Sequence, residues 1–120
     1  MVKPRVLLAE DDITMVSLLK TLLKMEGFEA ISIQPDDNVI QAMKTHKPNV
    51  LILDFHLGSQ NGLDVLDEIR KEKETKNIPV IMSSGANVKE ECLQHGANDF
   101  LMKPYMPDDL ISLLKQNISK

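Results

Sequence analysis

The chain is poor in the residues that cross-link small secreted domains or stack on nucleic-acid bases. Its 120 residues include one cysteine (Cys92), no tryptophan, one tyrosine and three phenylalanines. A lone cysteine excludes an internal disulfide and fits a reducing compartment, and so few aromatic side chains argue against a platform for base stacking. No apolar run approaches the length of a membrane span, and the apolar segment near the N-terminus is too short for a signal peptide. We therefore expect a cytoplasmic protein with no membrane association.

Positive charge is also scarce. Fourteen Lys and Arg residues stand against eighteen Asp and Glu residues, and the net charge is −4. The basic residues form no stripe, which argues against direct binding of nucleic acid. A hydrophobic content of 42% and a charged content of 27% are typical of a folded globular chain. At this length we expect one domain over residues 1–120.

Apolar segments with the pattern of buried strands alternate with helical patterns along the chain. The strand patterns lie at residues 5–9, 28–33, 49–54, 79–83 and 99–102. The helical patterns lie at residues 13–26, 36–46, 88–95 and 107–118, with a further one marked by Leu63, Leu66 and Ile69. This alternation predicts an α/β fold with a parallel sheet covered by helices on both faces.

Acidic residues stand where two of these strands end. Asp54 closes the third strand, and Glu10, Asp11 and Asp12 follow the first strand directly. Open α/β sheets place their ligands at the carboxyl ends of the strands, so these acids should meet. Their mutual repulsion requires a cation or a lysine, and carboxylate oxygens suit Mg²⁺. For Asp12 the structural interpretation, an N-cap of the following helix, is favoured.

A hydroxyl and an ammonium follow two further strands. Ser84 comes after the fourth strand and Lys103 after the fifth. A carboxylate such as Asp54 can accept a phosphoryl group as an acyl phosphate, provided that a metal and a cation neutralise the charge. Taken singly, such a serine is usually a turn former and such a lysine is usually solvated. Pro104 follows Lys103, and a cis bond between them would be one way to aim the lysine inward.

Four stretches taken together resemble the receiver domain of two-component response regulators, which has the CheY-like fold. They are VLLAEDD (6–12), VLILDFHLGSQNGLDVL (50–66), IPVIMSSGA (78–86) and HGANDFLMKP (95–104). The resemblance covers essentially the whole chain. It implies a doubly wound, five-stranded parallel sheet of strand order 2-1-3-4-5 with helices on both faces, as in flavodoxin-like proteins.

The resemblance also implies a phosphoacceptor and a metal site. Asp54 matches the phosphoacceptor. The ligands of Mg²⁺ (or Mn²⁺) would be Asp11 directly, Glu10 through water, Asp54, and the backbone carbonyl of His56 rather than its imidazole. The chain departs from the family at Gly58, where proline is usual, and this departure predicts a more flexible loop.

Three further residues match positions that surround the phosphoryl group. Ser84 matches the residue that hydrogen-bonds it, and Lys103 matches the lysine that pairs with it, joined by a cis bond to Pro104. Phe100 matches the aromatic residue whose rotamer reports the switch.

The implied function is signalling rather than metabolic catalysis. The phosphoryl group would come from a phosphohistidine on a sensor histidine kinase or a histidine phosphotransfer protein. The domain would assist its own phosphotransfer and slow autodephosphorylation. The fourth helix, fifth strand and fifth helix would then change to control a downstream effector or output domain. A monomer or a phosphorylation-dependent dimer fits this function.

Three other functions can be weighed against this one. A hydrolase that forms an aspartyl phosphate needs a second Asp two residues after the nucleophile, where His56 stands. A flavin-binding redox domain of the same topology needs a first loop that cradles phosphate, which the acidic run 10–12 would repel. A receiver that serves only as an interaction module would not need competent residues at all five site positions.

Overall fold

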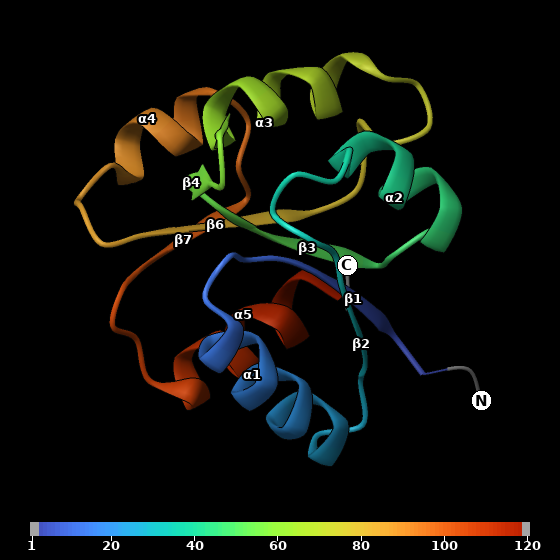
Figure 1. Cartoon of the computed structure of the whole chain (residues 1–120), viewed down its shortest axis with the longest axis vertical. Coiled ribbons are helices and arrows are strands. Elements are labelled where there is room, and N and C mark those ends of the chain that lie inside the picture. The colour runs from blue at the N-terminus through green and yellow to red at the C-terminus, as the bar shows by residue number, and fades with distance from the viewer. Residues whose placement is uncertain (1–2, 119–120) are drawn as a thin grey trace.

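A computed structural model of the protein describes residues 3–118 and has a five-stranded parallel sheet at its centre (Figure 1). The sheet has the spatial order β2-β1-β3-β6-β7, and every neighbouring pair is parallel. This arrangement confirms the predicted doubly wound sheet of order 2-1-3-4-5. The strands are β1 (Arg5–Ala9), β2 (Glu29–Ser32), β3 (Val50–Asp54), β6 (Val80–Ser84) and β7 (Asp99–Met102).

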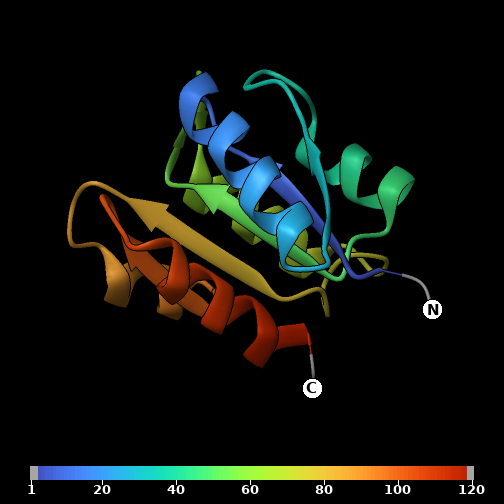
Figure 2. The ribbon, with the colours of Figure 1, turned by 90° about the horizontal axis from the view of Figure 1, so that it is seen from below.

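Five helices cover the two faces of this sheet. They are α1 (Ile13–Met25), α2 (Val39–His46), α3 (Gly62–Lys71), α4 (Lys89–Gln94) and α5 (Pro107–Ile118). Helices α2, α3 and α4 lie on one face, and α1 and α5 lie on the other, as the two views of the ribbon show (Figures 1 and 2). Within residues 3–118, no helix is both long enough and apolar enough to cross a membrane.

The strands alternate between two cores, one under each layer of helices. In β1, Leu7 and Ala9 face the core shared with α2, α3 and α4, whereas Val6 and Leu8 face the core shared with α1 and α5. Every residue of β3 and β6 is buried. A strand covered on both faces needs apolar side chains along most of its length, which explains why each of these strands starts as a continuous apolar run and carries polar residues only at its carboxyl end.

Helix α2 begins later than the sequence pattern indicated. The segment predicted to start it at Asp36 forms a turn, in which the backbone N–H of Gln34 donates to Asp37 Oδ2 at 2.8 Å. Asn38 then caps the helix by accepting from the backbone N–H of Gln41 at 3.0 Å. Side chains that bond to nearby backbone compete with the helix, so the acidic pair belongs to the turn and the asparagine marks the true start.

The chain between β3 and α3 contains a two-stranded hairpin that the sequence pattern did not predict. Its strands are β4 (His56–Leu57) and β5 (Gln60–Asn61). Two-residue strands are too short to show the alternation of apolar and polar residues by which strands are recognised. The hairpin is anchored by Leu57, whose side chain is fully buried in the core under α2, α3 and α4.

Helix α3 starts in close contact with the end of β3. The backbone N–H of Gly62 donates to the carbonyl of Phe55 at 2.7 Å, and a Cβ atom at Gly62 would lie only 2.6 Å from the carbonyl oxygen of Asp54. Only glycine fits such an approach. Asn61 caps the helix by accepting from the N–H groups of its first residues. The Asn61-Gly62 pair therefore sets where the helix packs beside the strand that carries Asp54.

Arg70 ties α3 to the amino-terminal ends of β6 and β7, at the opposite end of the sheet from Asp54. Its guanidinium donates to the carbonyls of Gly96 at 2.9 Å, Lys76 at 3.0 Å and Ile78 at 2.8 Å, and to Asn98 Oδ1 at 2.9 Å. One side chain thus holds the loop before β6 and the loop before β7 against α3. Only arginine offers enough fixed donors for four such acceptors.

Replacing Arg70 by methionine should lower the free energy of unfolding by about 2 to 3 kcal/mol, since several partly buried acceptors lose a charged donor. Arg70→Lys should recover only part of this loss, because an ammonium cannot reach the same set of acceptors. Urea unfolding monitored by circular dichroism measures the change. Lys71→Met, at an exposed position of the same helix, is the matched control. Equal stabilities for the Arg70→Met and Lys71→Met variants would contradict this role.

Candidate functional site

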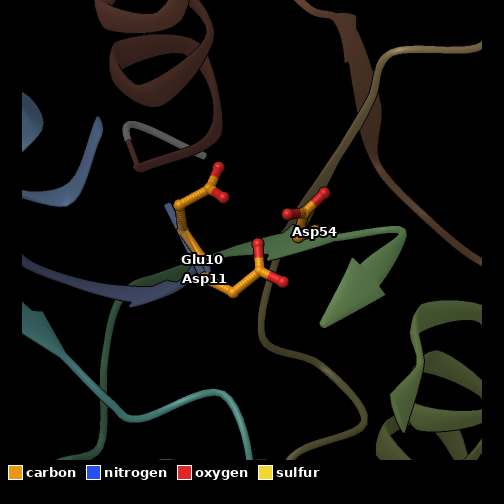
Figure 3. A group of neighbouring side chains, drawn as sticks. All are labelled: Glu10, Asp11 and Asp54. Carbon is orange, nitrogen blue, oxygen red and sulfur yellow. The ribbon is translucent and has the colours of Figure 1, made fainter. Parts of the chain in front are cut away.

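The parallel register brings three acidic side chains together at the carboxyl edge of the sheet. Ala9 pairs with Leu53, so Glu10 and Asp11 follow β1 directly beside Asp54 at the end of β3. One carboxylate oxygen from each acid lies within 4.8 Å of the others, and Figure 3 shows the three side chains next to one another. Glu10 and Asp54 are only 4% and 6% exposed, whereas Asp11 is open to solvent.

Lys103 lies between the two buried acids. Its Nζ is 2.5 Å from Glu10 Oε1 and 3.1 Å from Asp54 Oδ2. The peptide bond from Lys103 to Pro104 is cis, as the resemblance implied. The backbone N–H of Lys103 donates to the carbonyl of Ser84 at 2.7 Å, which holds the end of β7 against the end of β6. The lysine is thus an internal countercharge rather than a solvated surface residue.

The electrostatics of the pocket favour a proton on Asp54 when only Lys103 is present to balance the acids. Burial raises the pKa of Asp54 from 3.8 to about 7, and the adjacent Glu10 carboxylate, which would accept a hydrogen bond from protonated Asp54, adds to this rise. Lys103 opposes it only in part. For Lys103, burial lowers the pKa of the ammonium, but hydrogen bonding to Glu10 and the charges of both acids outweigh burial and raise that pKa overall.

The remaining predicted residues lie around this cluster. Ser84 is the buried last residue of β6, and its Oγ accepts from the backbone N–H of Ala86 at 3.1 Å. Phe100, in β7, is partly buried and packs against the core beneath α2, α3 and α4. The side chain of His56 is exposed. Asp12 caps α1, accepting from the backbone N–H of Met15 at 3.1 Å.

Sequence reasoning missed one polar group close to the cluster. Tyr105 follows Lys103 by two residues, and its hydroxyl is buried with no hydrogen-bond partner within residues 3–118. Burial and the charge of Glu10 raise the pKa of this phenol to about 12. Its only signal in the sequence is that it is the sole tyrosine and follows the Lys-Pro pair.

A doubly wound parallel sheet with two buried acids bridged by a lysine at its carboxyl edge is the arrangement that the resemblance to receiver domains implied. Residues 6–115 match the model of the response regulator receiver domain family. The chain therefore belongs to this family. Membership makes it a signalling domain and sets aside the hydrolase and flavin-binding alternatives.

Relatives with described functions share the domain at modest identity. The phosphate regulon transcriptional regulatory protein PhoB of Escherichia coli is 25% identical over 114 residues, which are 92% of this chain and 50% of PhoB. The DNA-binding response regulator MtrA of Mycobacterium tuberculosis is 26% identical over 121 residues, 98% of this chain and 52% of MtrA. This chain thus spans about half the length of the curated relatives it matches.

Solved structures resemble the whole chain. The receiver domain of NtrX from Brucella abortus superposes with a TM-score of 0.84 and 27% identity, covering 96% of this chain and 98% of that one. The chemotaxis response regulator CheY4 of Vibrio cholerae has a TM-score of 0.86 at 22% identity, covering 97% and 99%, and is similar in fold.

The raised pKa of Asp54 predicts how stability depends on pH in metal-free protein. Because the folded pKa of about 7 exceeds the unfolded value of 3.8, the fold binds this proton more tightly, and the associated stability is lost as pH rises between these two values. Asp54→Asn removes this titration. The free energy of unfolding of Asp54→Asn minus that of wild type should therefore increase from about pH 4 to about pH 8. Urea unfolding in chelator measures both, and a pH-independent difference would contradict the prediction.

Proposed function

We propose that residues 1–120 form a receiver domain that acts as a phosphorylation-driven switch, with Asp54 as the phosphoacceptor. The donor is a phosphohistidine on a sensor histidine kinase or a histidine phosphotransfer protein. One observation carries this proposal: the buried Asp54 carboxylate shares the Nζ of Lys103 with Glu10, at the carboxyl edge of the sheet and beside the exposed Asp11. A nucleophilic carboxylate, a fixed cation and further acidic ligands are what transfer of a phosphoryl group requires.

In the transfer step, a carboxylate oxygen of Asp54 attacks phosphorus, and the bond between phosphorus and the imidazole nitrogen breaks. The electron pair of that bond leaves with the imidazole, and an acyl phosphate forms on Asp54. Lys103 already contacts Asp54 and needs only a small movement to follow the charge onto the phosphoryl oxygens. The hydroxyl of Ser84, which donates no hydrogen bond to protein within residues 3–118, is available to donate to one of those oxygens.

The residues of the pocket fit a Mg²⁺ or Mn²⁺ ion. Glu10, Asp11 and Asp54 supply only carboxylate oxygens, the donors that hard divalent cations prefer. Three acids face one ammonium, so the cluster carries an unbalanced negative charge. We assign Asp11, Asp54 and the backbone carbonyl of His56 as direct ligands and Glu10 as a ligand through water. The ion would neutralise charge on the phosphoryl oxygens.

We further propose that phosphorylation changes the face formed by α4, β7 and α5. Ser84 leads into the loop before α4, and α4 has only six residues and no side-chain cap, because Val88 occupies its N-cap position. A short, uncapped helix belongs to the low-stability end of a fold. A movement of Ser84 toward the phosphoryl group would therefore shift α4 and Phe100 as well. This face would control a downstream effector or output domain, as the names of PhoB and MtrA as transcriptional or DNA-binding regulators suggest.

In this proposal the domain works in the cytoplasm, as a monomer or as a dimer formed on phosphorylation. It binds no nucleic acid itself, consistent with its net charge of −4.

Asp54→Asn should abolish phosphoryl acceptance. Incubation with acetyl phosphate and Mg²⁺, followed by intact-mass measurement, should show one added phosphoryl group on wild type and none on the variant. Asp12→Asn is the matched control, because asparagine caps a helix as well as aspartate does and Asp12 only caps α1. Phosphorylation of Asp54→Asn at the wild-type rate would overturn the proposal. A wild type that stays unmodified would indicate a receiver used only for interaction.

Mg²⁺ should stabilise wild type and do little for Asp11→Ala. At a concentration ten times its dissociation constant, the ion should add about 1.4 kcal/mol to the free energy of unfolding. For a domain of this size, that gain raises the melting temperature by several degrees. Thermal unfolding at matched ionic strength measures the shift. Equal shifts in wild type and Asp11→Ala would place the ion elsewhere.

A further inference from the structure

Asp11 differs from the other two acids of the cluster in how it is held. Glu10 and Asp54 are buried and share Lys103, whereas Asp11 is exposed and is not paired with a cation within residues 3–118. Its only side-chain hydrogen bond there comes from the backbone N–H of Gly58, which donates to Oδ2 at 3.2 Å. The other carboxylate oxygen has no protein donor. An exposed carboxylate without a partner would sample several rotamers, so this single bond decides where Asp11 points.

The donor of that bond is set in the turn of the β4–β5 hairpin. His56 pairs with Asn61 and Leu57 pairs with Gln60, so Gly58 and Ser59 form a two-residue turn. Gly58 has φ +57°, which fits the first central position of a type II′ turn. Proline has φ near −65° and no N–H, so it could neither form this turn nor donate to Asp11. The glycine that replaces the usual proline therefore has a specific place in the site.

The turn also rests on the loop between β2 and α2. A Cβ atom at Gly58 would lie 2.9 Å from Pro35 Cβ and 3.0 Å from Asp36 Oδ1, so the glycine lies directly against this loop. Gln60 fastens the contact, because its Nε2 donates to the carbonyls of Pro35 at 2.8 Å and Asp37 at 2.9 Å. Both N–H bonds of one side-chain amide are thus used to join two loops that are more than twenty residues apart in sequence.

We propose that the β4–β5 hairpin positions Asp11 for the divalent cation, with Gly58 as its donor and Gln60 as the clamp that holds the donor in place. The proposal rests on the metal-dependent function proposed above and assigns two positioning residues to it. Groups that hydrogen-bond a metal ligand fix its orientation, and their loss weakens metal binding on the order of tenfold or more. Neither Gly58 nor Gln60 touches the acceptor carboxylate, so they act only through Asp11 and its loop.

Gln60→Met tests the clamp, because methionine keeps the length of the side chain and removes both donors. Gln41→Met is the matched control: Gln41 lies on the exposed side of α2, near the same loop, and its side chain makes no hydrogen bond within residues 3–118. Calorimetric titration with Mg²⁺ at constant ionic strength should give a dissociation constant on the order of tenfold higher for Gln60→Met than for wild type. Gln41→Met should bind as wild type does.

The amide proton of Gly58 supplies a readout that needs no metal. In metal-free wild type its NMR resonance should lie downfield, as a hydrogen-bonded amide does. It should move upfield and exchange faster in Gln60→Met and in Asp11→Ala, and stay unchanged in Gln41→Met. Gly58→Ala, which places a methyl group against Pro35, should weaken Mg²⁺ binding independently of Gln60.

Three results would overturn the inference. Wild-type affinity for Mg²⁺ in both Gln60→Met and Gly58→Ala would show that the hairpin does not position Asp11, while the metal-dependent function would stand. An unchanged Gly58 amide in Asp11→Ala would show that the donor is not bonded to that carboxylate. A wild type that binds no Mg²⁺ would overturn the metal-dependent function itself and this inference with it.

Discussion

The site depends on one electrostatic constraint, the burial of two carboxylates beside each other. Glu10 and Asp54 are almost fully removed from water, and two such charges repel strongly where the dielectric constant is low. Lys103, held between them, offsets part of that repulsion. Burial of Asp54, with a contribution from the neighbouring Glu10 carboxylate, raises the pKa of Asp54 to about 7. A pocket with this unbalanced charge attracts protons or divalent cations, and it holds the Asp54 carboxyl group beside a fixed ammonium.

The parallel sheet is what makes this arrangement of charges possible. Its central strands are apolar up to their carboxyl ends and are anchored in two cores, so those ends are held in fixed register. The residues that carry the chemistry lie instead at the carboxyl edge of the sheet, where polar side chains are tolerated. At the other end of the sheet, Arg70 fastens loops to α3. The fold thus holds the loops in place at one end of the sheet and gathers the unbalanced negative charge of the acidic cluster at the other end.

The exposed member of the acidic cluster is controlled differently. Burial orders Glu10 and Asp54, but Asp11 lacks burial and depends on a backbone donor. That donor belongs to a turn held by contacts with a loop from another part of the chain. Two loops that are distant in sequence therefore meet at the edge that carries the acidic cluster, and the conformation of each affects the same carboxylate.

The sequence by itself determined the sheet, its helices and the residues of the acidic pocket, because hydrophobic period and the polar residues at strand ends are local signals. The cap at Asp12 was equally predictable, since helix capping acts within a few residues. Only the tertiary structure decided that Lys103 lies between Glu10 and Asp54, and that Gly58 and Gln60 reach Asp11 and the loop before α2. These features join segments 23 to 93 residues apart. Contacts at such separations leave no periodic trace in the sequence, and they form only when the packed sheet brings its loops together.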